Sequence, residues 1–399
     1  MKRILLQDIN IAGNNFDNLS LILDDSGSVV ILPLLFSIHL ETLGEVVRLN
    51  RYEMGDRIVT KLEPEPVSES TTRNYINHIC KFLRHINSKH QKDPSQNISI
   101  HQTYLCTPKQ VSEYINDDLI KTLTGNSLSN HQAALSAYFN FLAYMKLRKP
   151  HVIRVTRKAR KQAIALNQPP TYINYVTTQE RFELINICSC KRDKLILRCG
   201  YELGLRASEA RGLLLENNGT RKGFLYELFE QLDAPSKCHE KNFLYKLPGQ
   251  YAKRGKPRYL HISRDLLREL KDYYTTERAS ILSKIEQNAP TNLFIRRDPR
   301  GAGSPISKRL PSDLFNIYRK KLPYLDENLV YHDLRHTFAT ELFHEELKDS
   351  RGRETRSESA ALLTVALRLG HALSRDGNVA PTTTRYIRLR DIMLIVEES

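Results

Sequence analysis

The stretch His332-Asp333-Leu334-Arg335-His336 combines two imidazoles and a guanidinium at spacings of three and four residues. On a helix, these spacings place the three side chains on one face. A helix start also favours anions, because its first N–H groups and its dipole present positive charge. Grouping proton carriers with a phosphate clamp is hard to explain by packing. The stretch therefore predicts an anion site with proton transfer, in which His332 and Arg335 act directly and His336 supports them.

A second cation, Arg206, lies in Gly204-Leu205-Arg206-Ala207-Ser208-Glu209, just past a predicted helix stop at Gly204. A guanidinium held there can fork onto two phosphate oxygens. Glu209, three residues later, would hold its neighbours in place. An arginine at such a position also caps structural turns, so this motif alone leaves both roles open.

The turn Lys253-Arg254-Gly255-Lys256-Pro257-Arg258 lies between two predicted strands and is rich in cations. Such a tip can reach into a DNA groove, and one ammonium can protonate a departing oxygen. Either lysine of the turn, Lys253 or Lys256, could supply that proton, and Lys256 and Arg258 are predicted to contact DNA. Exposed lysines are common at turns, so this motif also needs the others for support.

A tyrosine completes the set. Leu369-Gly370-His371 is followed, after a loop, by Tyr386 on a predicted helix. A phenol has a pKa of about 10 and is a poor nucleophile at neutral pH, so it needs cations that stabilise the phenolate and the phosphorane. The preceding motifs would supply these cations. A lone tyrosine on such a helix is ordinarily core or surface, so the assignment of Tyr386 rests on the neighbouring motifs.

Helices and strands must bring these residues together. Apolar residues at three- and four-residue spacing predict helices, and short apolar runs between turn signals predict strands. In the second half of the chain, the predicted helices are a Thr178-capped helix to Ile187, Leu195–Leu203, Leu266–Ile285, Leu314–Lys321, His332–Leu347, Ala360–Leu369 and Thr383–Val396. The predicted strands are Phe224–Leu232, Asn242–Leu247 and Arg258–Ile262. The fold class that follows is mainly α with a small antiparallel β-sheet.

Four parts follow from the pattern along the chain. Residues 1–64 mix short apolar runs with turns and form an accessory, partly β module that ends at a linker near Glu63-Pro64-Glu65-Pro66. Residues 65–150 carry at least three helices and form a helical domain. Residues 151–175 form a basic interdomain linker, and residues 176–399 a mixed α+β catalytic domain. The linker cations predicted to contact DNA are Arg154, Arg157, Lys158, Arg160 and Lys161.

Composition narrows the partners of the chain. Its 399 residues include 60 Lys and Arg against 45 Asp and Glu, which leaves a charge of +15. Such an excess attracts a polyanion, either nucleic acid or an acidic membrane surface. The most apolar stretch, Val29–Leu40, is far shorter than the ~20 residues that cross a bilayer, so it is predicted as buried core. The six cysteines lack metal-site spacing and are expected as buried thiols in a reducing cytoplasm. No signal peptide is expected at the N-terminus, where the apolar run stops after three residues.

These motifs, in this order, resemble the tyrosine recombinase (phage integrase) family over the last 220 or so residues. The matches are Gly204–Glu209 to its first arginine box, Lys253 to its hairpin lysine, His332–His336 to its H-x-L-R-H box, Leu369–His371 to its L-G-H box and Tyr386 to its nucleophile. The resemblance implies a helical core-binding (DNA-binding) domain at residues 65–150, which closes a clamp on double-stranded DNA with the catalytic domain.

The resemblance also implies the reaction. Arg206 and Arg335 would clamp the scissile phosphate, and Tyr386 would form a 3′-phosphotyrosine while Lys253 protonates the 5′-oxygen. His332 would exchange protons with the tyrosine or orient it. Because the arginines would neutralise the charge of the transition state, no metal is expected. The phosphotyrosine would store the energy of the broken bond, so a 5′-hydroxyl of a second duplex can reverse the step and exchange strands without ATP. The expected assembly is a homotetramer on two DNA sites, with accessory DNA-bending or directionality proteins as further partners. The expected location is the bacterial cytoplasm, in association with the nucleoid and not with a membrane.

Two departures from the family pattern and three alternatives remain. The polar stretch Lys348–Ser359 and the loop Ala372–Pro381 lengthen the segments around His371. A type IB topoisomerase shares this chemistry but reseals the same strand, and a DNA-binding relative without catalysis would not need Tyr386. A metal-dependent nuclease would need clustered acidic residues, which the sequence does not offer. The target site, the direction of recombination and the host element are not encoded in these motifs.

Overall fold

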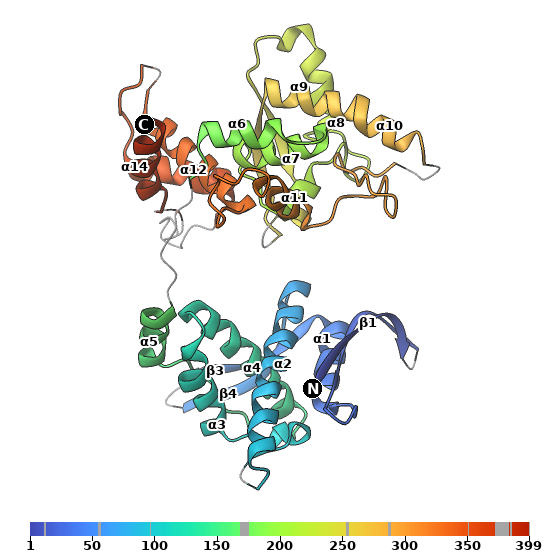
Figure 1. Cartoon of the computed structure of the whole chain (residues 1–399), viewed down its shortest axis with the longest axis vertical. Coiled ribbons are helices and arrows are strands. Elements are labelled where there is room, and N and C mark those ends of the chain that lie inside the picture. Colours follow the sequence, from blue (N-terminus) through green and yellow to red (C-terminus); the bar gives the residue numbers. More distant parts are fainter. Residues whose placement is uncertain are drawn as a thin grey trace. The chain divides into compact units, whose positions relative to one another are not determined.

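The computed structural model describes residues 1–11, 13–54, 57–95, 97–167, 175–252, 255–285, 289–349, 351–371, 383 and 385–398. The chain forms two compact units, Met1–Thr171 and Tyr172–Ser399 (Figure 1). Both are mainly helical, and the sheets are two-stranded and antiparallel. The predicted fold class is therefore confirmed.

The N-terminal unit combines two β-hairpins with helices. Its elements are β1 (Lys2–Ile11), β2 (Asn14–Leu23), α1 (Ile31–Leu43), β3 (Glu45–Met54), β4 (Arg57–Pro66), α2 (Glu69–Lys92), α3 (Pro108–Glu113), α4 (Gly125–Tyr144) and α5 (Arg157–Asn167). A π-turn at Tyr114–Asp118 and short 3₁₀ segments at Ile100–Leu105 and Leu119–Lys121 complete it. The expected β content of residues 1–64 and the expected helices after residue 68 are both present.

The predicted linker at Glu63–Pro66 is wrong, because these residues belong to β4. They pair with β3, with Val47 opposite Pro64 and Glu45 opposite Pro66. Proline cannot donate to a strand ladder, but a strand with only one partner leaves alternate N–H groups unused. Two prolines spaced two residues apart share one edge, and the strand therefore continues through them.

One hydrophobic core joins the hairpins to the helices. Phe36 and Leu40 of α1 are buried in the same cluster as Ile79, Phe82 and other residues of α2. The expectation that Val29–Leu40 is core is met in part, because Val30, Phe36 and Leu40 are buried but Ile31 and Leu35 are exposed. Residues 1–64 share their packing with the following helices, and the accessory role predicted for them stays a prediction.

The basic segment between the predicted domains contains a helix, α5, that packs on the N-terminal unit. It buries Ala159 and Ala163 and contacts α4 and the 3₁₀ turn at Leu119–Lys121. Small residues four apart let the helix approach closely on one face. The five cations predicted to contact DNA are exposed on its other faces and just before it. The rest of the predicted linker, residues 168–174, lies outside the described residues.

The C-terminal unit is built from helices around one small hairpin. Its elements are α6 (Thr178–Asn186), α7 (Lys191–Glu202), α8 (Leu225–Asp233), β5 (Asn242–Leu247), β6 (Arg258–Ser263), α9 (Arg264–Tyr273), α10 (Ala279–Leu282), α11 (Leu310–Arg319), α12 (Tyr331–Leu347), α13 (Glu358–Leu369) and α14 (Arg385–Glu398). A 3₁₀ turn spans Ala207–Gly212 and a π-turn spans Tyr274–Arg278. Most predicted elements are confirmed to within a few residues.

Two details of the prediction are wrong. Phe224–Leu232 is not a strand but helix α8, whose buried Leu225, Leu228 and Phe229 lie at spacings of three and four residues. Its aromatic residues suggested a strand, but the helical period decides the outcome. The N-cap of α6 is Thr177 rather than Thr178, because Thr177 forms a capping box with Glu180.

Helix α12 is the centre of the C-terminal unit, in contact with α7, α11, α13 and α14 (Figure 1). It therefore brings the motif at its start next to the elements that carry the other motifs. Within the described part of the chain, no helix is long and apolar enough to cross a membrane. Of the six cysteines, Cys80, Cys106 and Cys199 are buried, but Cys238 is exposed, contrary to the expectation of buried thiols.

Candidate active site

A single buried carboxylate organises the site. Glu209 is fully buried and binds the guanidinium groups of Arg206 at 2.5 Å and Arg258 at 2.8 Å. The guanidinium of Arg335 lies 3.5 Å from the same carboxylate. Glu209 also accepts the backbone N–H of Arg206 at 3.0 Å. Two arginines from motifs 129 positions apart in the sequence thus share one anion.

Arg335 fixes the backbone around this carboxylate. Its side chain is 1% exposed, and it donates to the carbonyl of Gly204 and, at 2.7 Å, to that of Leu369. An arginine has five N–H donors, so these two bonds leave others for a phosphate. The start of α12 is itself capped, because Asp333 accepts the N–H of Val330 at 2.7 Å. Both the helix and the guanidinium are therefore held before any ligand binds.

Gly204 makes the close approach of these segments possible. Its φ is +59°, and a Cβ there would lie 2.4 Å from Cδ1 of Phe338 on α12. Only glycine adopts this left-handed backbone without strain. The carbonyl of Gly204 accepts from both Arg335 and Arg258. The glycine predicted as a helix stop thus also supplies an acceptor to the arginine cluster.

The charges of the cluster shift one another. Burial alone would raise the pKa of Glu209, but Arg258, Arg335 and Arg206 outweigh it and keep the pKa below its ordinary value. Burial, together with the neighbouring Arg258 and Arg206, lowers the pKa of Arg335 to about 9. The three guanidinium groups therefore repel one another, and of the carboxylates that the structure describes, Glu209 is the one that they share. An added anion, such as a phosphate, would reduce this repulsion.

Two histidines border the cluster. The ring of His371 forms a 2.9 Å hydrogen bond between Nδ1 and Oγ1 of Thr383. Burial, followed by Arg335 and Arg206, lowers the pKa of His371 to about 4. His332 is exposed at the start of α12. Desolvation of its ring by the neighbouring side chains, followed by the charges of Arg335 and Arg206, lowers its pKa. Both rings are therefore neutral at pH 7 and can accept a proton when an anion enters.

Tyr386 lies in a core formed by α12, α13 and α14. It is 2% exposed and packs in a cluster with Phe338 and Leu369. Its ring centroid lies 5.9 Å from that of His336, which in turn lies 4.6 Å from that of His332. The N–H of Tyr386 donates to the carbonyl of Thr383, the residue that holds His371. The tyrosine helix thus reaches the same side of the unit as the arginines.

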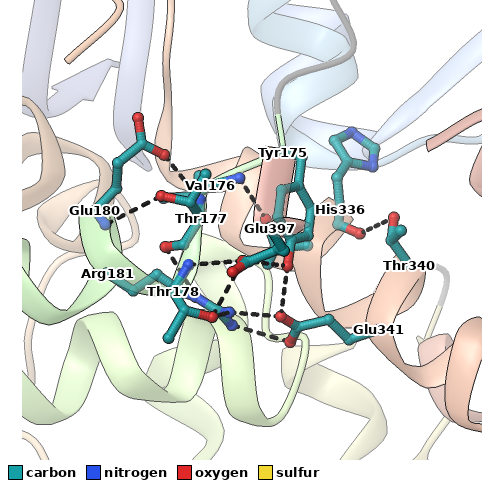
Figure 2. Close-up of polar contacts among 11 residues, drawn as sticks. Tyr175, Val176, Thr177, Thr178, Glu180, Arg181, His336, Thr340, Glu341 and Glu397 are labelled. Atoms are coloured by element: carbon teal, nitrogen blue, oxygen red, sulfur yellow. Dashed lines mark hydrogen bonds and ion pairs between the residues drawn. The ribbon is translucent and has the colours of Figure 1, made fainter. Parts of the chain in front are cut away.

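The far end of α14 is tied to the start of the C-terminal unit. The hydroxyl of Tyr175 lies 2.9 Å from Glu341 of α12 and 2.9 Å from Glu397 of α14. Glu397 also accepts the N–H of Thr178 at 2.8 Å, and Arg181 forms an ion pair with Glu341. Figure 2 shows these side chains turned toward one another from three segments. The tyrosine helix is therefore anchored at both of its ends.

Most of the predicted catalytic residues come together. The structure places Arg206, Glu209, His332, Arg335, His336, His371 and Tyr386 in one region of the C-terminal unit. Lys253, the predicted proton donor, lies outside the described residues. Lys256 is exposed next to β6. The five basic residues near α5 lie in the other unit, and their prediction as DNA contacts stays untested.

Arg258 is buried rather than exposed like Lys256 in the same turn, and its prediction as a DNA contact stays untested. Its side chain is 4% exposed and is occupied by Glu209 and two backbone carbonyls. The sequence held a signal for this placement. Leu260 and Ile262 are the apolar positions of β6 and point inward, and a strand repeats every two residues, so Arg258 shares their face. Thr383, Tyr175 and Glu397 were also missed, because nothing in their local sequence marks them.

Among the described residues, no group of three or more His, Cys, Asp or Glu side chains is arranged to hold a metal ion. The acidic residue at the centre of the site is occupied by arginines. These residues offer guanidinium groups that can bind an anion, two imidazoles able to take up protons, and a phenol on an adjacent helix. This combination suits nucleophilic attack on a phosphodiester.

Comparisons with known proteins agree with this arrangement. The sequence model described as the phage integrase family matches residues 174–351. Transposase A of transposon Tn554 from Staphylococcus aureus is 23% identical over 359 residues, covering 90% of this chain and 77% of that protein. Tyrosine recombinase XerA of Pyrococcus horikoshii is 25% identical over 338 residues, covering 84% and 90%. The XerH site-specific recombinase in a post-cleavage complex with its difH substrate superposes with a TM-score of 0.51 at 17% identity, covering 82% and 80%. This last likeness establishes the fold.

Proposed function

Since the chain belongs to the tyrosine recombinase (phage integrase) family, we propose that the arginine cluster around Glu209 is its active site and Tyr386 its nucleophile. The protein is a site-specific recombinase, an enzyme that cleaves and rejoins DNA through a phosphotyrosine intermediate. The observation that carries the assignment of residues is the shared carboxylate. It supports this assignment because Arg206 and Arg335 bind the same carboxylate and the helix of Arg335, α12, packs against the helix of Tyr386.

Arg206 and Arg335 bind the non-bridging oxygens of the scissile phosphate. Guanidinium groups that are already fixed stabilise the charge that develops in the pentacovalent transition state without reorganising. Arg335 is held by two carbonyls and Arg206 by Glu209, so both are preorganised. The clamp supplies the electrostatic stabilisation of the reaction, and we propose that neither metal nor ATP is required.

Proton transfer completes each step. The phenol of Tyr386 loses its proton as its oxygen attacks phosphorus, and the 5′-oxygen of the leaving strand gains one. Lys253 donates that second proton, and His332 takes up or returns the proton of the phenol. His371 donates a hydrogen bond to a non-bridging oxygen. The phosphotyrosine keeps the energy of the broken bond, so a 5′-hydroxyl from another duplex can displace the tyrosine and join the strands.

The buried position of Tyr386 fits a resting state. At 2% exposure the phenol is packed rather than presented to solvent. DNA binding has to bring the phosphate to the tyrosine or release the tyrosine toward it. We propose that α14, which carries Tyr386 and packs on α12, is the element that moves.

Double-stranded DNA is the partner of this site. We propose that the exposed cations Arg154, Arg157, Lys158, Arg160 and Lys161 contact its phosphates, with Lys256 near the active site. We also propose a homotetramer on two DNA sites, assisted by a DNA-bending or directionality protein. Phosphate contacts carry no base preference, so the target sequence depends on other groups.

A nicked suicide substrate tests the nucleophile. The short strand released by the nick cannot rejoin, so the covalent adduct accumulates and survives SDS. Wild type is expected to form the adduct and Tyr386→Phe to form none, while both bind the DNA equally. If Tyr386→Phe still forms the adduct, the nucleophile is a different residue.

The same substrate separates the two lysines of the hairpin turn. Lys253→Ala is expected to lose cleavage, and Lys256→Ala to lower DNA affinity with a smaller effect on the cleavage rate. A bridging sulfur in place of the 5′-oxygen makes a leaving group that needs no proton, so it should restore cleavage by Lys253→Ala. Loss of cleavage only in Lys256→Ala would transfer the role of proton donor to Lys256.

A further inference from the structure

Arg258 joins three separate segments of the active site. It is the first residue of β6, directly after the basic turn. Its Nη2 donates to the carbonyl of Gly204 at 3.2 Å and to Glu209 at 2.8 Å, and its Nη1 donates to the carbonyl of Arg368. One guanidinium thus connects the hairpin, the first arginine box and the end of α13.

The end of α13 depends on this contact. The carbonyl of Arg368 accepts from Arg258 and that of Leu369 accepts from Arg335. Two cations therefore cap the negative end of the helix dipole. Gly370 follows with a φ of +64°, and a Cβ there would lie 2.9 Å from Cδ of Arg258. His371 comes next, so the turn that carries this histidine packs directly against the side chain of Arg258.

We propose that Arg258 is a positioning residue for strand cleavage, which holds His371 and Arg206 in register around the phosphate. It acts on His371 through the end of α13 and on Arg206 through the carboxylate of Glu209. The proposal rests on the proposed function. This role differs from a DNA contact, and because Arg335 is buried as deeply as Arg258, the salt dependence of DNA binding, rather than burial, separates the two roles.

Lysine cannot replace this arginine. The planar fork of a guanidinium reaches acceptors in different directions at once, whereas an ammonium is a point charge at the end of a flexible stem. Arg258→Lys keeps the charge of the cluster and loses part of the geometry. Arg258→Met keeps the size and loses the charge, and Glu209 then still has Arg206 and Arg335 as partners.

Arg278 provides a matched control. It is also a buried arginine of the same unit, 3% exposed. Within the part of the chain that the structure describes, its guanidinium donates to backbone carbonyls alone, those of Pro290, Asn292 and Leu293. Arg278→Lys therefore removes a buried fork of similar size without touching Glu209. A loss of stability alone should be common to both arginines.

The experiment compares wild type, Arg258→Lys, Arg258→Met and Arg278→Lys in the full chain. Adduct formation on the nicked suicide substrate is measured from pH 5 to pH 9, together with DNA affinity against salt and thermal unfolding. Both Arg258 variants are expected to slow cleavage by about 10- to 100-fold, the effect of displacing a catalytic group by ~1 Å. The salt dependence of DNA binding should not change, because no phosphate contact is lost.

The pH profile distinguishes positioning from stability. Among the described residues, the charged and titratable groups around Glu209 are Arg206, Arg258, Arg335, His332 and Tyr331. Removing the cation at position 258 raises the pKa of Glu209, which must be ionised to hold Arg206. The acid side of the profile should therefore move to higher pH in Arg258→Met and stay in place in Arg278→Lys.

Three results would overturn the proposal. Cleavage by Arg258→Lys at the wild-type rate would show that the fork is not needed. A weaker salt dependence of DNA binding would make Arg258 a phosphate contact. An equal loss of cleavage and an equal pH shift in Arg278→Lys would leave only a structural role. If wild type itself formed no adduct, or Tyr386→Phe formed one, the proposed function would fail instead, whatever the Arg258 variants did.

Discussion

Replacing Glu209 by glutamine removes one charge from the centre of the site and almost no volume. The carboxylate is fully buried and holds guanidinium groups at 2.5, 2.8 and 3.5 Å. In Glu209→Gln one oxygen becomes an NH₂ group, which points hydrogen atoms at cations that are themselves only donors. The three arginines would then face one another with no anion among them.

The magnitude follows from these contacts. Hydrogen bonds to charged groups stabilise by about 1.5–3 kcal/mol and neutral ones by about 0.5–1.5 kcal/mol, so two weakened bonds cost about 2–3 kcal/mol. A donor left without an acceptor in the interior adds about 1–3 kcal/mol. The sum of about 3–6 kcal/mol overlaps the about 3–5 kcal/mol found when one partner of a buried ion pair is removed. Unfolding of the C-terminal unit should therefore begin many degrees lower.

Calorimetry of the full chain measures this effect, with Glu327→Gln as the control. Glu327 is exposed, and its substitution removes the same charge with an expected change within about 0.5 kcal/mol. Inorganic phosphate should return part of the stability lost in Glu209→Gln, because an anion can occupy the space between the arginines. A decrease below about 1 kcal/mol, or a decrease that phosphate does not reduce, would refute the idea that this carboxylate keeps the cluster together.

Three further predictions concern other parts of the site. Gly204→Ala should destabilise the protein by about 2–5 kcal/mol, measured by urea unfolding, because the left-handed backbone costs an alanine about 1–2 kcal/mol and the overlap with Phe338 about 1–3 kcal/mol. Tyr175→Phe should raise hydrogen exchange in α14, because the hydroxyl beside Glu397 is lost; unchanged exchange would mean that other contacts hold the helix. The pKa of His371 is lowered to about 4, so between pH 6.5 and 4 the unfolded state binds more protons than the folded state. The free energy of unfolding should therefore decrease as the pH is lowered through that window. His371→Gln should flatten that part of the curve, and an equally steep curve would assign it to other groups.

The sequence was informative where a motif carried its own local evidence. His332, Arg335 and His336 lie on one turn of a helix, so their common face followed from helical spacing alone. Most helices of the C-terminal unit were found because their apolar residues recur at the helical period, and α8, which was predicted as a strand, is the exception. The separate motifs were assembled by resemblance to a family, and the structure supplies the contact that joins them, the carboxylate of Glu209.

The rest depended on contacts between distant residues. Arg258 was placed with the exposed cations of its turn because charge is the usual sign of exposure, yet the period of β6 carries it inward to Glu209. The anchor of α14 joins Tyr175 and Glu397, which are 222 positions apart, and no local pattern marks either residue. The prolines of β4 were read as a linker because their pairing with β3 is also a distant contact.

The net charge of the three arginines and Glu209 gives a chemical reason for their number. Three guanidinium groups and one carboxylate leave an excess of two positive charges in the interior. A phosphodiester brings one negative charge, and its pentacovalent transition state carries two. In the reaction that we propose, the charge of these three arginines and Glu209 would therefore match the transition state rather than the ground state, which is the condition for catalysis by differential binding. Without Glu209 the excess would be three, and the repulsion among the arginines would disperse them. With a second carboxylate the excess would be one, and the site would match the bound phosphate instead. One buried glutamate among three arginines thus satisfies both requirements, a stable fold before DNA binds and the strongest attraction at the point of reaction.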